Sequence, residues 1–224
     1  MPQKTDKKKF IFFYLIIFLI LSSIHNSNVK YNNFFIVKKI EVLGLDKTDN
    51  LLLEKKLKYL IGSNIFTINK ESFELIKSEN LINRYNVKKI YPNQIKVYLE
   101  SAVAISVIKY LNDLFILGNN GKIIDLKSLP LNVPEVNGTN DIKKVFQTIK
   151  IINKSNYNIR NIKKIIFFPS DRIDIVLENK KKIRFPINLT VDNLNLSLQL
   201  VEDEALNASK IIDLRIPSKV ITYE

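Results

Sequence analysis

A chain of 224 residues, 46% of them hydrophobic, is long enough for one or two folded modules and too apolar to be disordered. The formal net charge is +13, but lysines are scattered along the chain in pairs such as Lys38-Lys39 and Lys88-Lys89. A nucleic-acid-binding protein would gather its charges in one stripe with aromatic residues, so this pattern disfavours that class. The absence of cysteine excludes a disulfide framework and thiolate metal sites.

The N-terminal residues predict a membrane anchor. "KTDKKK" precedes an uncharged run from Phe10 to Ile24, which covers about 22 Å as a helix. Extension to Val29 reaches the ~30 Å of a bilayer core. Because no A-x-A-like pair marks a cleavage site, we expect an uncleaved signal anchor at 10–29, with a cleaved signal peptide as the alternative. The preceding lysines place residues 1–9 in the cytoplasm as a short tail, and the rest of the chain outside it.

The next residues predict a module in the order strand, helix, helix, strand, strand. "VKKIEVLGL" alternates apolar and polar residues and ends at Gly44, as a strand does. "DNLLLEKKLKYLIG" has helical periodicity, with Thr48 or Asp49 as its cap, and a second helix is expected from about Lys70 with Asn69 as its cap. "NVKKIYPNQIKVYLE" predicts a hairpin that turns at Pro92-Asn93.

The second half of the chain predicts a longer antiparallel sheet with helices on it. "LFILGNNGKIID" is typical of a hairpin, "SLPLNVPEVNG" of a connection, and "IKKIIFFPSDRIDIVLENKKKIRF" of a three-stranded meander. Two closing strands are expected in "IIDLRIPSKVITYE". Two apolar stripes predict the helices: Ile142, Val145, Phe146, Ile149 and Ile152, then Leu194, Leu198, Val201 and Ala205.

Candidate catalytic residues are scarce. The single histidine, His25, lies at the edge of the expected anchor, so the exported region has no base for a Ser-His or Cys-His nucleophile. Asp171, Asp174 and Glu178 lie on a predicted hairpin, where solvated charge is the ordinary explanation. The few glycines are typical of turns rather than of a phosphate-binding loop. We therefore expect a binding protein that is not an enzyme, with no cofactor, no metal and no small-molecule substrate.

Several motifs, in this order and spacing, resemble the FtsQ family of bacterial cell division proteins, called DivIB in Gram-positive bacteria. In the first module they are "IEVLGL", "IGSNIFTIN" and "VKKIYPNQIKVYLE"; in the second they are "LFILGNNGKIID", "LPLNVPEVNG" and the closing "IIDLRIPSKVITY". The resemblance covers nearly the whole chain. It implies an α+β protein with one N-terminal transmembrane helix, a POTRA-like βααββ domain at 34–100 and a mostly antiparallel β domain at 101–224.

The same resemblance implies a function and a location. The expected protein is a non-catalytic scaffold of the divisome that links early and late division proteins and binds the FtsB–FtsL complex, which controls septal peptidoglycan synthesis. Other division proteins are expected to bind the POTRA-like domain. The expected place is the bacterial inner membrane at the septum, with a single span and periplasmic domains. The alternative is a membrane-anchored, exported enzyme that acts on the cell wall through carboxylates.

The last strand is the candidate binding site. A sheet that ends on an unpaired strand presents free N–H and C=O groups, to which a partner strand can add. We expect Lys219, Val220, Ile221, Thr222 and Tyr223 to form this edge, and Arg215 and Ile216 at the bend to anchor the partner's side chains. An ordinary terminal strand, with Lys219 protecting the edge, is the alternative.

Overall fold

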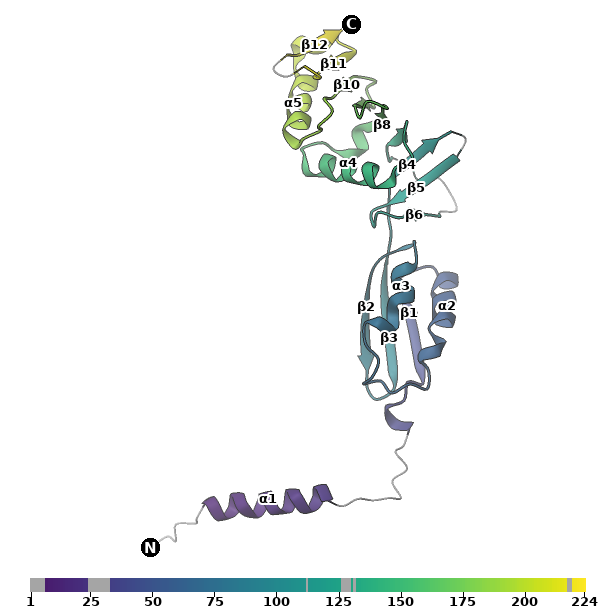
Figure 1. Ribbon diagram of the computed structural model, residues 1–224, viewed down its shortest axis with the longest axis vertical. Coiled ribbons are helices and arrows are strands. Elements are labelled where there is room, and N and C mark those ends of the chain that lie inside the picture. Colours follow the sequence, from purple (N-terminus) through teal and green to yellow (C-terminus); the bar gives the residue numbers. More distant parts are fainter. Residues whose placement is uncertain (1–6, 24–32, 112, 126–129, 131, 217–218) are drawn as a thin grey trace.

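The computed structural model describes residues 7–23, 33–111, 113–125, 130, 132–216 and 219–224. Its folded part contains two sheets, one of three strands and one of nine. Figure 1 shows the three-stranded sheet lying between the short 3-10 helix η1 (Asn33–Phe35) and the nine-stranded sheet, whose far end carries the C-terminus. Residues at η1 and at the C-terminus therefore lie at opposite ends of the folded part.

The first sheet has the strand order β1-β3-β2, with β1 parallel and β2 antiparallel to the central β3. Its apolar residues, such as Ile95 and Val97, alternate toward a buried core beneath α2 and α3. The first predicted strand and both strands of the predicted hairpin belong to this one sheet. The elements are β1 (Lys39–Leu43), α2 (Lys47–Lys56), η2 (Lys58–Leu60), η3 (Glu71–Phe73), α3 (Glu74–Ser78), β2 (Ile82–Ile90) and β3 (Gln94–Ser101).

The prediction that Thr48 or Asp49 caps the first helix is wrong, because α2 begins at Lys47 with Asp46 as its cap residue. Asn50 explains the earlier start. Its amide oxygen accepts a hydrogen bond from the Leu45 N–H at 3.1 Å, and its amide nitrogen donates to the Leu45 C=O at 2.8 Å. These bonds fix the turn that leads into the helix. The prediction that Asn69 caps the second helix is wrong, because this segment starts as η3 with Lys70 as its cap residue and continues into α3. The Asn69 side chain still accepts a hydrogen bond from the Ser72 N–H at 3.2 Å.

The second sheet has the order β12-β11-β10-β9-β8-β7-β4-β5-β6. The expected meander of β8, β9 and β10 is confirmed by its antiparallel register. The strands are β4 (Ala104–Tyr110), β5 (Asp113–Gly118), β6 (Ile123–Ile124), β7 (Glu135–Asn137), β8 (Ile162–Phe167), β9 (Ile173–Leu177), β10 (Lys182–Arg184), β11 (Ile211–Asp213) and β12 (Ile221–Tyr223). The helical elements are α4 (Ile142–Lys154), η4 (Ile159–Asn161), α5 (Val191–Glu202) and η5 (Glu204–Leu206).

Antiparallel pairs predominate in this sheet, but β7 is parallel to both of its neighbours, β4 and β8, and β10 is parallel to β11. The interpretation of "SLPLNVPEVNG" as a connection alone is therefore wrong, because it contains β7 in the middle of the sheet. Pro134 immediately precedes this strand, and its C=O accepts a hydrogen bond from the Val107 N–H at 3.0 Å. Three residues are too few for a visible alternation of apolar and polar side chains.

The two predicted helical stripes face the core of the second sheet. Val145, Ile149 and Ile152 on α4 are buried there, as is Leu194 on α5. Ala205 lies beyond the end of α5, in η5. Asp141 ends the preceding loop and accepts a hydrogen bond from the Lys144 N–H, which fixes the start of α4.

Two glycines in the resembling motifs occupy positions that exclude any side chain. Gly44 follows β1 with φ of +117°, and a Cβ there would lie 1.9 Å from the Leu99 carbonyl oxygen. Gly138 follows β7 with φ of +84°, and its Cβ would lie 2.0 Å from the Phe167 carbonyl oxygen. In both places a strand ends against the backbone of its neighbour, which only glycine permits.

Helix α1 (Lys7–Ser23) contains most of the expected anchor, and its large apolar side chains from Phe10 to Leu21 are exposed. Among the described residues, no helix combines the length and the apolar character needed to cross a membrane. The part of the expected span at 24–29, including His25, lies outside the described residues.

Candidate functional site

The C-terminal strand forms one end of the nine-stranded sheet. β12 is antiparallel to β11, with Ile221 opposite Asp213 and Tyr223 opposite Ile211. No other described strand pairs with its outer side. The expected edge is thus present, although the strand is shorter than predicted, because Lys219 and Val220 precede it. Residues 217 and 218 of the predicted turn lie outside the described residues.

The hydrogen bonds of β11 indicate which backbone groups of β12 face outward. The Lys182 N–H donates to the Lys210 C=O, and the Leu214 N–H donates to the Arg184 C=O, so even-numbered residues of β11 face β10. Because alternate residues of a strand bond to opposite sides, Ile211 and Asp213 face β12. Their partners, Tyr223 and Ile221, therefore bond inward, and the N–H and C=O of Thr222 point to the open edge.

A row of charged residues crosses the strands beside this edge. Arg184 on β10 lies directly opposite Asp174 on β9 and Asp213 on β11. The neighbouring positions, Ile175, Ile183 and Ile212, form a parallel row that is buried in the core under the helices. Since successive side chains of a strand point to opposite faces, the charged row lies on the face away from α4 and α5.

Arg215 is held by Asp213 at the start of the final bend. The Arg215 Nη2 donates to Asp213 Oδ2 at 2.6 Å, its Nε donates to Oδ1 at 2.8 Å, and its backbone N–H donates to Oδ1 at 3.1 Å. Arg184 Nη1 lies 3.5 Å from the same carboxylate. These hydrogen bonds from Arg215 lower the pKa of Asp213 below its ordinary value. The aspartate and arginine of the closing "IDLR" thus form one unit that fixes the bend.

Asp174 has a less favourable environment. Its side chain is almost completely buried, and Arg172 Nε lies 3.3 Å from its Oδ1 without the geometry of a hydrogen bond. Both of these atoms are buried without a hydrogen-bond partner among the described residues. Burial, only partly offset by the nearby arginines, raises the pKa of Asp174 above its ordinary value.

We expect Asp213→Asn to lower the free energy of unfolding at pH 7 by about 1–3 kcal/mol, because a hydrogen-bonded carboxylate is lost. Its partner Arg215 is 38% exposed, so screening by solvent favours the lower part of this range. Since the folded-state pKa of Asp213 is lowered, its contribution is present above the unfolded value of about 4 and is lost as pH falls through the folded value. Urea unfolding of wild type and variant should therefore differ less at pH 3 than at pH 7.

Asp174→Asn is the matched control. Because the folded-state pKa of Asp174 is raised, the stability given by its protonated form is present below about pH 4 and is lost as pH rises through the folded value. Its removal should therefore cost less at pH 7 than the removal of Asp213. A larger loss in Asp174→Asn than in Asp213→Asn would contradict this assignment.

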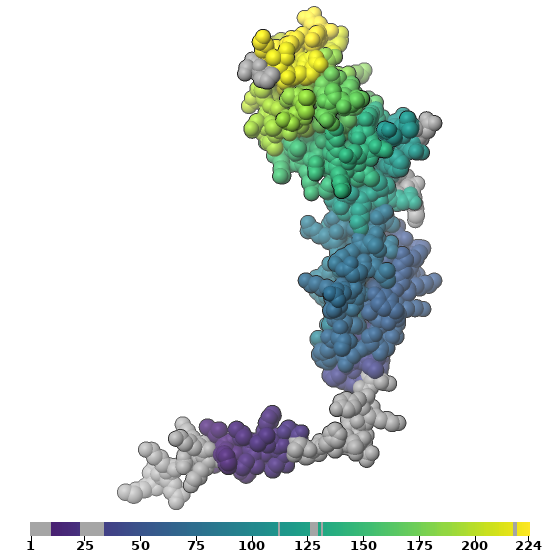
Figure 2. Space-filling view, in the orientation of Figure 1, coloured from purple at the N-terminus to yellow at the C-terminus, as the bar shows by residue number. Residues whose placement is uncertain are grey.

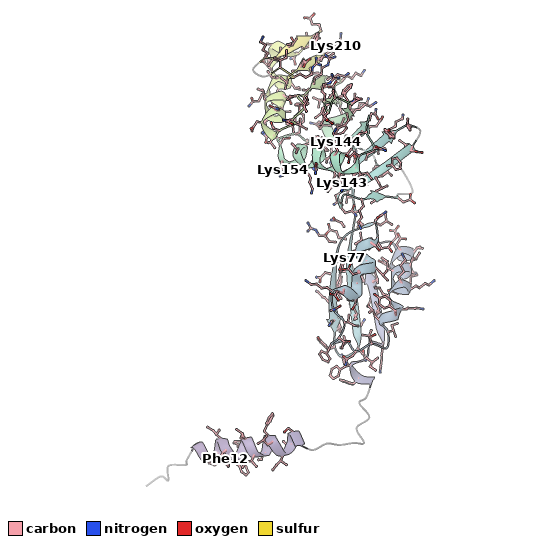
Figure 3. All side chains as sticks on the ribbon, viewed as in Figure 1. Phe12, Lys77, Lys143, Lys144, Lys154 and Lys210 are labelled. Carbon is pink, nitrogen blue, oxygen red and sulfur yellow. The ribbon has the colours of Figure 1, made fainter. Side chains whose placement is uncertain are left out.

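Apolar and cationic side chains surround the open edge. A groove of about 350 Å³ between α5 and the final bend is lined by Leu214, Ile216, Lys219 and Val220, together with Pro186, Asn193 and Leu196. The guanidinium of Arg184 lies over the Tyr223 ring at 5.5 Å from its centre. Figure 3 shows Lys210 beside the C-terminal strands as well. The arrangement can accept an extended segment on β12, a side chain in the groove and an acidic group among the cations.

The three carboxylates of the predicted hairpin do not form one cluster. Asp171 pairs with Lys144 from α4, Asp174 lies beside Arg172, and Glu178 is exposed. In the part of the chain that the structure describes, no group of three His, Cys, Asp or Glu side chains could hold a metal ion.

A larger groove of about 560 Å³ lies on the first sheet, far from the charged row. It runs beside β2, which is an edge strand of that sheet, and its lining includes Ile68, Phe73 and Val87. It offers a second apolar surface on the first module.

Sequence reasoning placed Arg215 and the terminal strand at this site but missed Arg184, Asp174 and Arg172. Asp174 lies on β9, Arg172 two residues earlier just before that strand, and Arg184 on β10, in the segments "RIDIV" and "KIRF". The alternation within each segment indicates which face its charged side chains share, whereas only the register of β9, β10 and β11 shows that they meet.

No family model matches the chain. Two curated relatives from Clostridium botulinum, both named "Cell division protein DivIB", match over 132 residues each, at 26% identity in strain Hall and 25% in strain Loch Maree. Each match covers 58% of this chain and 52% of the relative, so the chain spans about half the length of the curated relatives it matches.

A comparison with solved structures finds the major extracytoplasmic domain of the trans isomer of the bacterial cell division protein DivIB from Geobacillus stearothermophilus. It aligns at 16% identity with a TM-score of 0.37, over 48% of this chain and 97% of that chain.

Proposed function

We propose that the chain, which is similar to curated proteins named DivIB, belongs to the FtsQ/DivIB family of cell division proteins and is a non-catalytic scaffold of the divisome. In this proposal it links early and late division proteins and binds the FtsB–FtsL complex through β12. The observation that carries the proposal is the open edge of β12, where the Thr222 backbone faces outward beside an apolar groove. An added strand would gain main-chain hydrogen bonds from the edge and specificity from the groove.

The partner segment is proposed to be acidic. Several cationic side chains lie on or beside the last three strands, whereas Asp174 and Asp213 are already engaged with arginines. These cations include Lys182, Arg184, Lys210, Arg215 and Lys219. Exposed charges of this kind raise the rate of association with a partner of opposite charge and make binding sensitive to salt.

Membrane anchoring by 10–29 and periplasmic placement of the rest at the septum are part of the proposal. The exposed apolar side chains of α1 and the lysines that precede Phe10 support this topology. The assignment of 34–100 as a POTRA-like domain and of 101–224 as an FtsQ-type β domain is likewise proposed. The groove beside β2 is then a surface for further division proteins.

Binding to the purified FtsB–FtsL homologues tests the proposed function. We expect Lys219→Glu to weaken affinity by about tenfold, equivalent to 1.4 kcal/mol, because it reverses an exposed charge beside the edge. Lys219 is preferred to Arg215 for this test, because replacement of Arg215 by glutamate would also place a second carboxylate beside Asp213 and destabilise the bend. Lys154→Glu on α4, away from the edge in Figure 3, is the matched control. Equal affinities of both variants and wild type, or no binding by wild type, would refute the proposal.

A further inference from the structure

Four exposed aromatic rings form a continuous surface at the end of the first module opposite the second sheet. Phe34 contacts Phe35 with ring centres 5.1 Å apart, Phe35 contacts Phe66 at 5.0 Å, and Phe66 stacks on Tyr91 at 5.3 Å. Phe34, Phe66 and Tyr91 are each more than half exposed. We call these four residues the aromatic end.

Three separate segments build this surface. The Ile65 N–H donates to the Phe35 C=O at 2.9 Å, and the Lys38 N–H donates to the Asn93 C=O at 2.8 Å. The first bond joins η1 to the loop before η3, and the second joins the segment that follows η1 to the turn between β2 and β3. The rings are therefore held by backbone hydrogen bonds while their faces stay in solvent, an arrangement that costs stability unless another surface covers it.

The same three segments are cationic throughout. Residues 33–40, 58–70 and 88–96 contain seven lysines and no aspartate or glutamate: Lys38, Lys39, Lys58, Lys70, Lys88, Lys89 and Lys96. Lys39 and Lys96 pair with Glu41, just outside these segments, and Lys88 lies over Tyr98. The fold thus gathers at one end the lysine pairs 38–39 and 88–89, which are far apart in the sequence.

The position of this end in the chain indicates what covers it. Figure 2 shows η1 seated on the end of the first module that faces away from the second sheet. In the sequence only nine residues separate the last residue of α1, Ser23, from Asn33. A chain of that length reaches about 35 Å at full extension. With α1 in the bilayer, the aromatic end lies within reach of the lipid headgroups.

We propose that the aromatic end is a membrane-contacting surface that inserts Phe34, Phe35, Phe66 and Tyr91 into the headgroup region of a bilayer containing anionic lipid. Aromatic side chains favour the membrane–water interface, where an apolar ring and a polar group are both accommodated. Lysines near an anionic surface are attracted by its negative potential. This contact would hold the first module against the membrane and orient the rest of the molecule away from it. The proposal rests on the proposed anchoring of α1.

Tryptophan fluorescence tests this contact, because the chain contains no tryptophan. Three single-tryptophan variants of the full chain are reconstituted into vesicles of phosphatidylcholine with phosphatidylglycerol, with and without brominated acyl chains that quench tryptophan. Tyr14→Trp reports on α1, Phe66→Trp on the aromatic end, and Phe115→Trp on β5 of the second sheet. Tyr91→Trp is a second reporter of the aromatic end, and circular dichroism checks that each variant is folded.

We expect brominated lipid to reduce Phe66→Trp emission at least about twofold and to leave Phe115→Trp emission unchanged, because quenching requires contact with the acyl chains. Tyr91→Trp should follow Phe66→Trp. Weaker quenching of Phe66→Trp in pure phosphatidylcholine would confirm the contribution of the lysines. Failure of quenching at Tyr14→Trp alone would refute the anchoring of α1 and leave the membrane contact of the aromatic end supported.

Two results would overturn the proposal. Equal quenching of Phe66→Trp and Phe115→Trp would indicate nonspecific adsorption to the vesicles. An unquenched Phe66→Trp and Tyr91→Trp, with Tyr14→Trp quenched, would show that the anchored protein keeps its aromatic end off the membrane. If emission of these two variants then changed on addition of a single-stranded oligonucleotide, stacking on bases would be the function of the lysine-rich aromatic surface instead.

Discussion

Thr222→Pro is expected to weaken binding of the FtsB–FtsL homologues by at least about 100-fold, equivalent to roughly 2.7 kcal/mol, while the fold is retained. Proline removes the Thr222 N–H, which faces the open edge, and its ring obstructs a strand that approaches from that side. Proline also favours extended backbone at the residue before it, which Ile221 already has as part of β12. Isothermal titration of the purified folded region with the partner complex measures the effect.

Two further variants distinguish the loss of pairing at the open edge from the loss of the Thr222 side chain and from destabilisation of β12. Thr222→Ala keeps the backbone N–H and should bind within about twofold of wild type. Ile221→Pro removes an N–H that faces β11 and should instead reduce the thermal stability of the C-terminal strands. Prolines at the adjacent positions Ile221 and Thr222 are therefore expected to have different effects, because their N–H groups face opposite sides of β12. Unchanged affinity in Thr222→Pro would make β12 an ordinary terminal strand.

Gly44→Ala is expected to lower the free energy of unfolding by more than about 3 kcal/mol, or to prevent the first sheet from forming. The added Cβ would lie 1.9 Å from the Leu99 carbonyl oxygen, and Leu99 is a central residue of β3 that cannot move without breaking the sheet. The backbone at Gly44, with φ of +117°, adds strain for any residue with a side chain. Urea unfolding followed by circular dichroism measures the loss.

Gly62→Ala provides the matched control, because Gly62 also has a positive φ, of +92°, but no heavy atom lies within 4 Å of its added Cβ. It should cost only the strain of the left-handed backbone, about 1–2 kcal/mol. The difference between the two variants isolates the contact with Leu99. Equal losses at the two positions would mean that strain alone explains why a glycine ends β1.

The sequence was informative where a pattern is local and long. The alternation in "IEVLGL" and "IKVYLE" predicted β1 and β3, and the stripe from Val145 to Ile152 predicted α4. The order of such motifs also led to the resemblance to the FtsQ/DivIB family, and both curated relatives that match the chain are named DivIB. These features depend on side-chain periodicity within one element, which is present in the residues themselves.

Features that depend on pairing between distant segments could not be predicted from the sequence. β7 has three residues and is identified only by its parallel neighbours β4 and β8. Arg184 belongs to the site because its register sets it between Asp174 and Asp213. The aromatic end joins residues separated by more than fifty positions, and the scattered lysine pairs were used only as an argument against nucleic-acid binding. A sequence pattern records what one segment contains, whereas these sites are set by which segments meet.

The aromatic end and β12 lie at opposite ends of the folded part. Their separation restricts where a membrane-anchored partner can carry its pairing segment. With the aromatic end at the bilayer, β12 stands beyond the whole first module, whose strand β2 of nine residues alone spans about 30 Å. A partner anchored in the same membrane by a helix that continues outward rises about 1.5 Å per residue. Its pairing segment must therefore come at least about 20 residues after its own span. On these two proposals, the first module excludes partners whose pairing segment lies closer than this to their own membrane span, whatever the sequence in between.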